Sequence, residues 1–310
     1  MCIAFWVLNT TTTSDTEDTH DLVLAFNRDE YLERPTKGFH AWEAHPNIFA
    51  PKDLKPDDES HRGSWIGVNR QGRLALLTNF REPVPHHDGK ISRGALVRDF
   101  LLNKPVTPGG QTVDIDKGIR EYAEAIFNER QRYDGFNLVL MDLVPGRRQA
   151  VYVTNRGAVG HDGQPGTIAN VGDGGVAGLS NSTIDNPWPK VVKGRQQFED
   201  RLKAHGIEAG DEGLVNALMD MMSNTAPFTP DNQPTEITDL MRCVFVPKVN
   251  GLRWTGVDNA TVLVSHDGYG TRTTDILLLR KNKLTIAERN HYPQDPDSSA
   301  IEVSHVELQV

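Results

Sequence analysis

The sequence predicts an α+β fold, a layered sandwich in which helices cover mainly antiparallel sheets. Apolar strand-like runs come in neighbouring pairs joined by turns, which is typical of antiparallel hairpins. Helical stretches also come in pairs, so the element order is strands, helices, strands, helices, strands. Because strands and helices do not alternate singly, a doubly wound parallel sheet is disfavoured.

The first part of the chain contains two predicted hairpins. Residues 2 to 8 and 22 to 27 are rich in Ile, Val, Leu and Phe, and a polar loop separates them. A charged stretch without periodicity, residues 51 to 63, predicts a loop. Residues 64 to 68 and 73 to 80 then read as the second hairpin, with a glycine in the turn between them.

Two helix pairs are predicted from apolar residues at helical spacing. The first pair covers residues 94 to 103 and a segment that begins at Asp114 or Asp116 and ends at residue 132. The second pair covers residues 188 to 205 and 211 to 222.

The remaining strands lie between and after the helix pairs. A Pro-Gly turn separates two of them, residues 136 to 143 and 149 to 154. The last third of the chain returns to β-rich runs. These runs cover residues 243 to 246, 261 to 265, 273 to 280, 283 to 288 and 301 to 308.

Length and composition are those of a globular protein. With 310 residues, 37% of them hydrophobic, and no repeat or long linker, we expect a single domain over residues 1–310. The net charge is −9 and the basic residues are scattered among acidic ones, so nucleic acid is not an expected partner. No run approaches the roughly 18 apolar residues of a transmembrane helix. The first residues lack the basic leader of a secretory signal.

The two cysteines, Cys2 and Cys243, are far apart in the sequence. A disulfide framework is therefore not expected, and a reducing compartment such as the cytoplasm is. If Met1 is removed, Cys2 carries a thiol and a free α-amine, which together form a nucleophile and its base. The alternative is that Cys2 is a small apolar residue that opens a buried strand. Cys243 lies in an apolar run and is expected to be buried and inert.

Polar residues stand at the ends of apolar strands in four places, residues 27 to 30, 78 to 82, 180 to 182 and 269 to 273. Each alone is ordinary turn chemistry. Together with Cys2 they suit a thiol that attacks an amide or thioester carbonyl, which needs a base, positive charge and oxyanion donors. The residues that supply these functions would be Arg28 and Arg272 for positive charge, Asp29 to orient the ammonium, and Asn79 and Asn181 as oxyanion donors.

Several motifs in order carry a resemblance to a known family. They are Met1-Cys2, Asn27-Arg28-Asp29-Glu30-Tyr31, Trp65-Ile66-Gly67-Val68-Asn69, Leu77-Thr78-Asn79-Phe80-Arg81-Glu82, Gly135-Phe136-Asn137-Leu138, Leu179-Ser180-Asn181 and Tyr269-Gly270-Thr271-Arg272. From residue 1 to about residue 280 the chain resembles the transport and Golgi organization protein 2 family, also called the NRDE family. The resemblance implies a four-layer αββα sandwich like that of the N-terminal nucleophile hydrolases. It also implies ligand contacts from motif residues, namely Asn27, Glu30, Trp65, Phe80 and Tyr269.

The chain is also distantly similar to the cysteine branch of those hydrolases, the bile salt hydrolases and penicillin V acylases. The residues that match that branch are Cys2, Asn79, Asn181 with Ser182, and Arg272. Those enzymes separate the Arg and Asp by two residues, whereas Arg28 and Asp29 are adjacent here. Adjacent residues on a strand point to opposite faces. Either the strand has ended at this point or only one of the two faces Cys2.

The family resemblance implies an intracellular factor in Golgi organisation and protein secretion that handles lipid, acyl-CoA or haem. It would bind a small apolar ligand in a pocket at Cys2, in the cytoplasm or at the Golgi or mitochondrion, with peripheral membrane contact possible. No cofactor is required, and haem or acyl-CoA would be a ligand. The alternatives are a Cys2-dependent amidohydrolase or acyltransferase and a purely structural role. A metal site is not expected, because His86, His87 and Asp88 have no second ligand group at a recognised spacing.

Overall fold

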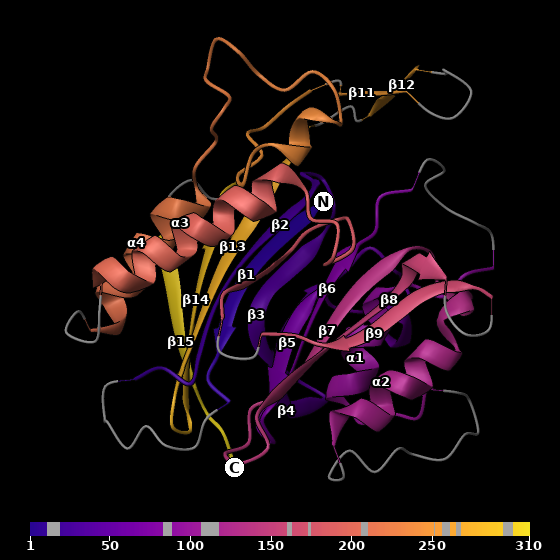
Figure 1. The fold of residues 1–310 in the computed structure, drawn as a ribbon, viewed down its shortest axis with the longest axis vertical. Coiled ribbons are helices and arrows are strands. Elements are labelled where there is room, and N and C mark those ends of the chain that lie inside the picture. The colour runs from indigo at the N-terminus through magenta and orange to yellow at the C-terminus, as the bar shows by residue number, and fades with distance from the viewer. Residues whose placement is uncertain are drawn as a thin grey trace.

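The computed structural model describes residues 1–10, 19–82, 89–106, 118–159, 163–172, 175–205, 210–250, 252–255, 261–264, 268–293 and 300–310. Two mainly antiparallel sheets face each other, and a pair of helices covers the outer face of each (Figure 1). The α+β sandwich predicted from the sequence is confirmed, with the layer order helices, sheet, sheet, helices. The helices are α1 (Gly94–Leu101), α2 (Ile119–Asn128), α3 (Pro189–His205) and α4 (Asp211–Met222).

The sheet that contains the N-terminus, named sheet I here, has six strands in the order β10-β1-β2-β13-β14-β15. Its strands are β1 (Cys2–Leu8), β2 (Leu22–Tyr31), β10 (Ala177–Leu179), β13 (Tyr269–Arg280), β14 (Lys283–Asn290) and β15 (Ile301–Glu307).

The facing sheet, named sheet II, has seven strands in chain order from β3 to β9. Its strands are β3 (Thr36–Trp42), β4 (His45–Asp53), β5 (Ile66–Asn69), β6 (Arg73–Asn79), β7 (Phe136–Asp142), β8 (Gln149–Val159) and β9 (Pro165–Asn170). A separate ribbon pairs β11 (Leu252–Thr255) with β12 (Thr261–Val264).

Side-chain alternation along the strands builds the layers. In β1 the even-numbered residues, Ala4 and Trp6 among them, pack between the two sheets. The odd-numbered Ile3 and Phe5 pack on the other face of sheet I, against α3 and α4. The outer face of sheet II packs in the same way on α1 and α2. Each face of each sheet is thus apolar where another layer covers it, as a period of two residues requires.

Most predicted elements are present with small differences at their ends. Both helix pairs were predicted, although Asp114 and Asp116, the expected starting points of α2, lie outside the described residues. Strands β3, β4, β9, β10 and β11 were not predicted. The first three are partly exposed and lack a clear alternation, and the last two have only three and four residues. No helix in the described ranges is long and apolar enough to cross a bilayer.

The polar residues predicted to end or enter strands lie inside strands instead. Asn27 to Glu30 belong to β2, which continues to Tyr31, and Tyr269 to Thr273 form the first part of β13. These two polar segments pair with each other in the middle of sheet I. Their backbone hydrogen bonds are satisfied by neighbouring strands, so polar side chains can extend the strands beyond their apolar parts.

The predicted strand over residues 243 to 246 is wrong. These residues form an irregular segment that packs its apolar side chains against α4 and sheet I. Its backbone groups bond to sheet I outside the strand ladder. The Asn27 side chain donates to the Val244 carbonyl at 3.1 Å, and the Val246 amide donates to Thr271 Oγ1 at 2.8 Å. An apolar run alone does not separate a buried strand from a buried loop of this kind.

Candidate functional site

A cleft of about 820 Å³ opens beside the N-terminus. Its wall is built from the start of β1, the end of β2, the end of β6, the start of β13, the residues before α1 and the turn after β10. In Figure 1 the N-terminus lies at the end of the sandwich where β1 and β2 of sheet I come close to β6 of sheet II. Nine of the eleven predicted site residues line this one cleft: Cys2, Arg28, Asp29, Glu30, Trp65, Asn79, Phe80, Asn181 and Tyr269.

Cys2 is held at the base of the cleft by its own backbone. Its amide donates to Asn181 Oδ1 at 3.1 Å, and its carbonyl accepts from Ser180 Oγ at 2.6 Å. The residue is 9% exposed. Burial raises the pKa of the Cys2 thiol above its ordinary value, while the N-terminal ammonium and Arg28 act to lower it. The thiol is therefore mostly protonated near neutral pH in the chain that carries Met1.

Met1 lies across the same part of the cleft. Its ammonium donates to the Asp29 carbonyl at 2.7 Å and to the Tyr269 hydroxyl. Its carbonyl accepts from the Asp29 amide at 2.6 Å, which extends the pairing of β1 with β2 by one residue. Removal of Met1 would convert the Cys2 nitrogen from an amide to an α-amine with Asn181 Oδ1 beside it.

Asn181 acts as a brace between the two sheets. Its Oδ1 accepts from the Cys2 amide in sheet I, and its Nδ2 donates at 2.5 Å to the carbonyl of Asn79, the last residue of β6 in sheet II. The Asn79 side chain itself makes no hydrogen bond with a described residue and is exposed to the cleft. Asn79 is thus the better placed of the two amides to donate to a bound ligand.

Arg28 faces Cys2, and Asp29 does not. Arg28 is directly opposite Cys2 in the β1–β2 register, and such partners share one face of a sheet. The strand has not ended there, so the second of the two sequence-based alternatives holds. The Arg28 guanidinium carbon lies 3.9 Å from the centroid of the Trp65 ring, and its Nη2 lies 3.4 Å from Glu30 Oε2. Its Nη1 is buried and has no hydrogen-bond partner among the residues that the structure describes.

The Asp29 carboxylate points to the helix-covered face of sheet I. Its Oδ1 accepts from Thr271 Oγ1 at 2.6 Å, and its Oδ2 lies 3.8 Å from Lys190 Nζ of α3. Burial raises the pKa of Asp29, and Lys190 acts against this rise. The predicted orientation of the N-terminal ammonium is performed by the Asp29 backbone carbonyl, not by its carboxylate.

Glu30 completes the charged floor of the cleft. Burial acts to raise its pKa, but Arg28, the N-terminal ammonium and Arg34 outweigh burial, and the pKa lies below its usual value. Arg34 is fixed in turn by a two-point contact with Asp53, at 3.1 and 2.6 Å. Glu30 therefore stays ionised and holds Arg28 in place.

Two predicted site residues, Asn27 and Arg272, do not line the cleft. Asn27 lies on the helix-covered face of sheet I, where its Nδ2 donates to the carbonyls of Met222 and Val244. Arg272 occupies a β-bulge opposite Arg28 and Asp29, and its Nη1 donates to the Arg34 carbonyl. Both residues stand behind the cleft wall and fix the strands that form it.

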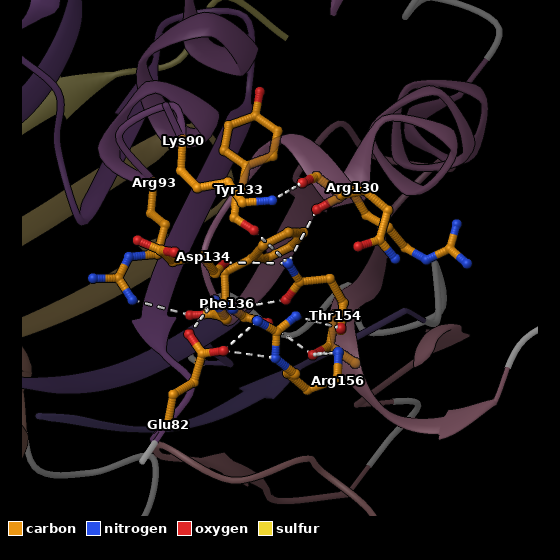
Figure 2. Close-up of polar contacts among 12 residues, drawn as sticks. Glu82, Lys90, Arg93, Arg130, Tyr133, Asp134, Phe136, Thr154 and Arg156 are labelled. Atoms are coloured by element: carbon orange, nitrogen blue, oxygen red, sulfur yellow. Dashed lines mark hydrogen bonds and ion pairs between the residues drawn. The ribbon is translucent and has the colours of Figure 1, made fainter. Parts of the chain in front are cut away.

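Sequence reasoning missed a polar cluster on the sheet II side of the cleft (Figure 2). Glu82 accepts from Arg156 Nε at 2.9 Å and from the Gly135 amide at 2.7 Å. Arg93, in the turn before α1, donates from Nη1 to the Gly135 carbonyl at 3.1 Å. The run Leu77 to Glu82 pointed to this wall, but nothing in the sequence linked it to Arg93 or Arg156. Lys190 was missed for the same reason, whereas Ser180 belongs to a motif noted in the sequence but was given no role there.

No group of three or more His, Cys, Asp or Glu side chains suited to a metal ion occurs among the residues that the structure describes. His86, His87 and Asp88, which the sequence analysis weighed as a metal site, lie outside those residues.

Comparison with known proteins identifies the family of this chain. The family model described as Transport and Golgi organisation 2 matches residues 1–293. The chain belongs to this family. The bovine Transport and Golgi organization protein 2 homolog is 30% identical over 298 residues, which cover 96% of this chain and 95% of that protein. The mouse homolog is 31% identical over 297 residues and covers 95% of both chains. Transport and Golgi organization protein 2 of Drosophila melanogaster is 27% identical over 302 residues, 96% of this chain and 94% of that one.

Solved structures of hydrolases also resemble this member of the Transport and Golgi organisation 2 family. A mutant conjugated bile acid hydrolase from Clostridium perfringens matches with a TM-score of 0.48 and 10% identity, over 99% of this chain and 92% of that one. A Caenorhabditis elegans ortholog of N-acylethanolamine-hydrolyzing acid amidase matches with a TM-score of 0.43 and 10% identity, over 98% of this chain and 100% of that one.

Proposed function

We propose that this protein is a ligand-binding factor that serves Golgi organisation and protein secretion, and that its ligand is a small molecule with an apolar part. The names of its relatives support the cellular role. The observation that carries the binding role is the cleft of about 820 Å³ at Cys2, a volume typical of small-molecule sites. An acyl-CoA or haem is the class of ligand proposed, as cargo and not as a resident cofactor.

The cleft combines apolar and charged walls, which suits an amphipathic ligand. Its apolar lining includes Trp65, Leu77, Phe80, Ile237 and Leu240. Its floor carries the charged pair of Arg28 and Glu30. We place the protein in the cytoplasm, in contact with the Golgi or the mitochondrion as a peripheral factor. Fractionation of cells that express the tagged protein tests this location.

Titration with octanoyl-CoA and with haem tests the binding role. Saturable binding of either one is the expected result. Asn79→Trp fills the cleft from an exposed position of its wall and should abolish binding. Val192→Trp introduces the same side chain at an exposed position of α3 and should leave binding unchanged. Binding that survives Asn79→Trp, or that is absent from the unaltered protein, would contradict the proposal.

A second candidate function is a Cys2-dependent amidohydrolase or acyltransferase. The hydrogen bond of the Cys2 nitrogen to Asn181 and the position of Arg28 opposite Cys2 favour it. After removal of Met1, the α-amine would take the thiol proton and the sulfur would attack the acyl carbonyl carbon. The bond from that carbon to nitrogen or to the leaving sulfur would break, and the leaving group would take the proton from the ammonium. Water or an acceptor would then cleave the thioester on Cys2.

Two measurements decide between the candidates. Intact mass of the protein from its native host shows whether Met1 is absent, as the hydrolase mechanism requires. Labelling with a thiol-reactive acyl probe should go to Cys2 in preference to Cys243, whose side chain is fully buried and whose pKa burial raises to about 11. Retained Met1, or equal labelling of the two cysteines, would remove the hydrolase and leave the binding role.

A further inference from the structure

Acidic residues of the cleft form ion pairs, and the pairs are Asp29 with Lys190, Glu30 with Arg28, Asp53 with Arg34, and Glu82 with Arg156. A further acidic residue of the cleft, Asp134, acts to raise the pKa of Arg93. Lys190 and Arg156 do not line the cleft. Each of the two neutralises a carboxylate of a cleft-lining residue from a position outside the cleft. Some basic residues that line the cleft therefore have no ion-pair partner among these four carboxylates.

Of the four arginines that line the cleft, Arg81 and Arg93 belong to none of these ion pairs. Arg81 Nη1 lies 3.6 Å from Met241 Sδ, and Arg93 Nη1 donates to the Gly135 carbonyl at 3.1 Å. Neither forms an ion pair with a residue that the structure describes, and both line the cleft. Because a guanidinium carries five N–H donors, each of these side chains retains several for a ligand.

The two arginines share one wall, and this wall continues to Cys2. The Gly135 carbonyl accepts from Arg93 and also, at 2.9 Å, from the amide of Phe80, the residue before Arg81. The Arg81 amide donates at 2.9 Å to the carbonyl of Asn181, whose side chain holds Cys2. In Figure 2 a dashed line from the Arg93 guanidinium marks its hydrogen bond to the Gly135 carbonyl, and Asp134 lies beside Arg93.

Both guanidinium groups are partly removed from water. Burial lowers the pKa of Arg81, and burial lowers that of Arg93 against the opposing effect of Asp134 and Glu82. A partly desolvated cation that forms no ion pair with a described residue is unfavourable, so an anion that contacts the guanidinium directly would stabilise it.

We propose that Arg81 and Arg93 form an anion-binding subsite of the cleft, which receives a phosphate or carboxylate group of the ligand. The planar donor fork of arginine matches either group in a two-point contact. This inference rests on the proposed ligand-binding function. It adds that the bound molecule is an anion whose charged group lies on the wall next to Cys2, with its apolar part against Trp65, Leu77 and Leu240.

Calorimetric titration of the full chain with octyl phosphate, octanoate and 1-octanol tests the subsite. At least one of the two anions should bind roughly tenfold tighter than the alcohol, as expected for one or two charge-assisted hydrogen bonds. Arg81→Gln and Arg93→Gln should each reduce the affinity for that anion by about the same factor and leave that for octanol unchanged. Arg201→Gln, on the exposed face of α3, is the matched control and should change none of the affinities. Thermal unfolding checks that the variants are folded.

The outcomes separate the subsite from the function on which it rests. A larger loss for octyl phosphate than for octanoate identifies phosphate as the natural group, and the reverse identifies carboxylate. Equal affinity for all three probes, unchanged in both cleft variants, overturns the subsite and leaves a ligand-binding cleft. If none of the probes binds and octanoyl-CoA and haem also fail, both the subsite and the proposed function are overturned.

Discussion

Arg28 and Asp29 are neighbours in one strand and are almost equally buried, at 4% and 3% exposure, yet they serve opposite layers of the molecule. Arg28 faces the space between the sheets, stacks on Trp65 and lines the cleft. The Asp29 carboxylate faces α3, where Lys190 is its ionic partner and both side chains are fully buried. The difference follows from the pleat alone, since consecutive strand residues point to opposite faces.

The comparison shows that burial alone does not reveal what a charged residue does. Lys190 and Asp29 are enclosed by protein, so their contact serves the packing of α3 on sheet I. Arg28 is enclosed only in part, because it lines the cleft and its Nη1 has no hydrogen-bond partner among the described residues. We therefore expect changes at Lys190 to act on folding and changes at Arg28 to act on the cleft.

Lys190→Met should have the largest effect on stability. It leaves the Asp29 carboxylate buried without a cation, which costs about 3 to 5 kcal/mol of the free energy of unfolding. Urea denaturation at pH 7 measures this loss. The double variant Asp29→Asn, Lys190→Met should recover most of it, because no buried charge remains. Arg28→Met should cost clearly less, since Glu30 keeps Arg34 as a neighbour. Equal losses for Lys190→Met and Arg28→Met would break the comparison.

Glu288 is another buried carboxylate, and it has no basic ion-pair partner among the described residues. Its ionisation should make the stability of the protein depend on pH. Glu288 lies opposite Asp275 on the neighbouring strand, and burial raises the pKa of Glu288 from 4.5 to about 6. A carboxyl whose pKa is raised by folding stabilises the protein when protonated, so this contribution is lost as the pH rises from 4.5 to 6. Relative to Glu288→Gln, the free energy of unfolding of the unaltered protein should fall by about 2 kcal/mol over that range. Urea denaturation of both proteins at several pH values measures the difference, and parallel pH profiles would contradict the prediction.

Arg28→Gln should have the smallest effect, on the reactivity of Cys2. The positive charge of Arg28 acts to lower the pKa of the Cys2 thiol against burial. Its removal raises that pKa further, so alkylation of Cys2 by iodoacetamide at pH 8 should slow by roughly threefold to tenfold. Peptide mass spectrometry follows each cysteine separately, and Cys243 serves as the internal control. An unchanged rate at Cys2 would show that Arg28 does not influence the thiol.

The candidate site could be predicted in part because its residues stand in recognisable local sequences. Cys2, Arg28, Asn79 and Asn181 come from three separate strand regions and a turn, and the structure brings them to one cleft. Asn27 was predicted with them from the same run, but the pleat places it on the opposite face. Arg93 and Lys190 could not be predicted, because each depends on how a helix and its preceding turn pack on a sheet formed elsewhere in the chain.

The α+β class, the paired helices, most strands and the family could be predicted from the sequence, because apolar periodicity and short motifs are local properties of the chain. The folded structure was needed to show which face of β2 each charged residue serves and that residues 243 to 246 are not a strand. It was also needed to show which cleft arginines form no ion pair with a described residue. These outcomes depend on strand register and on contacts between distant segments, and both are set by the packing of the layers.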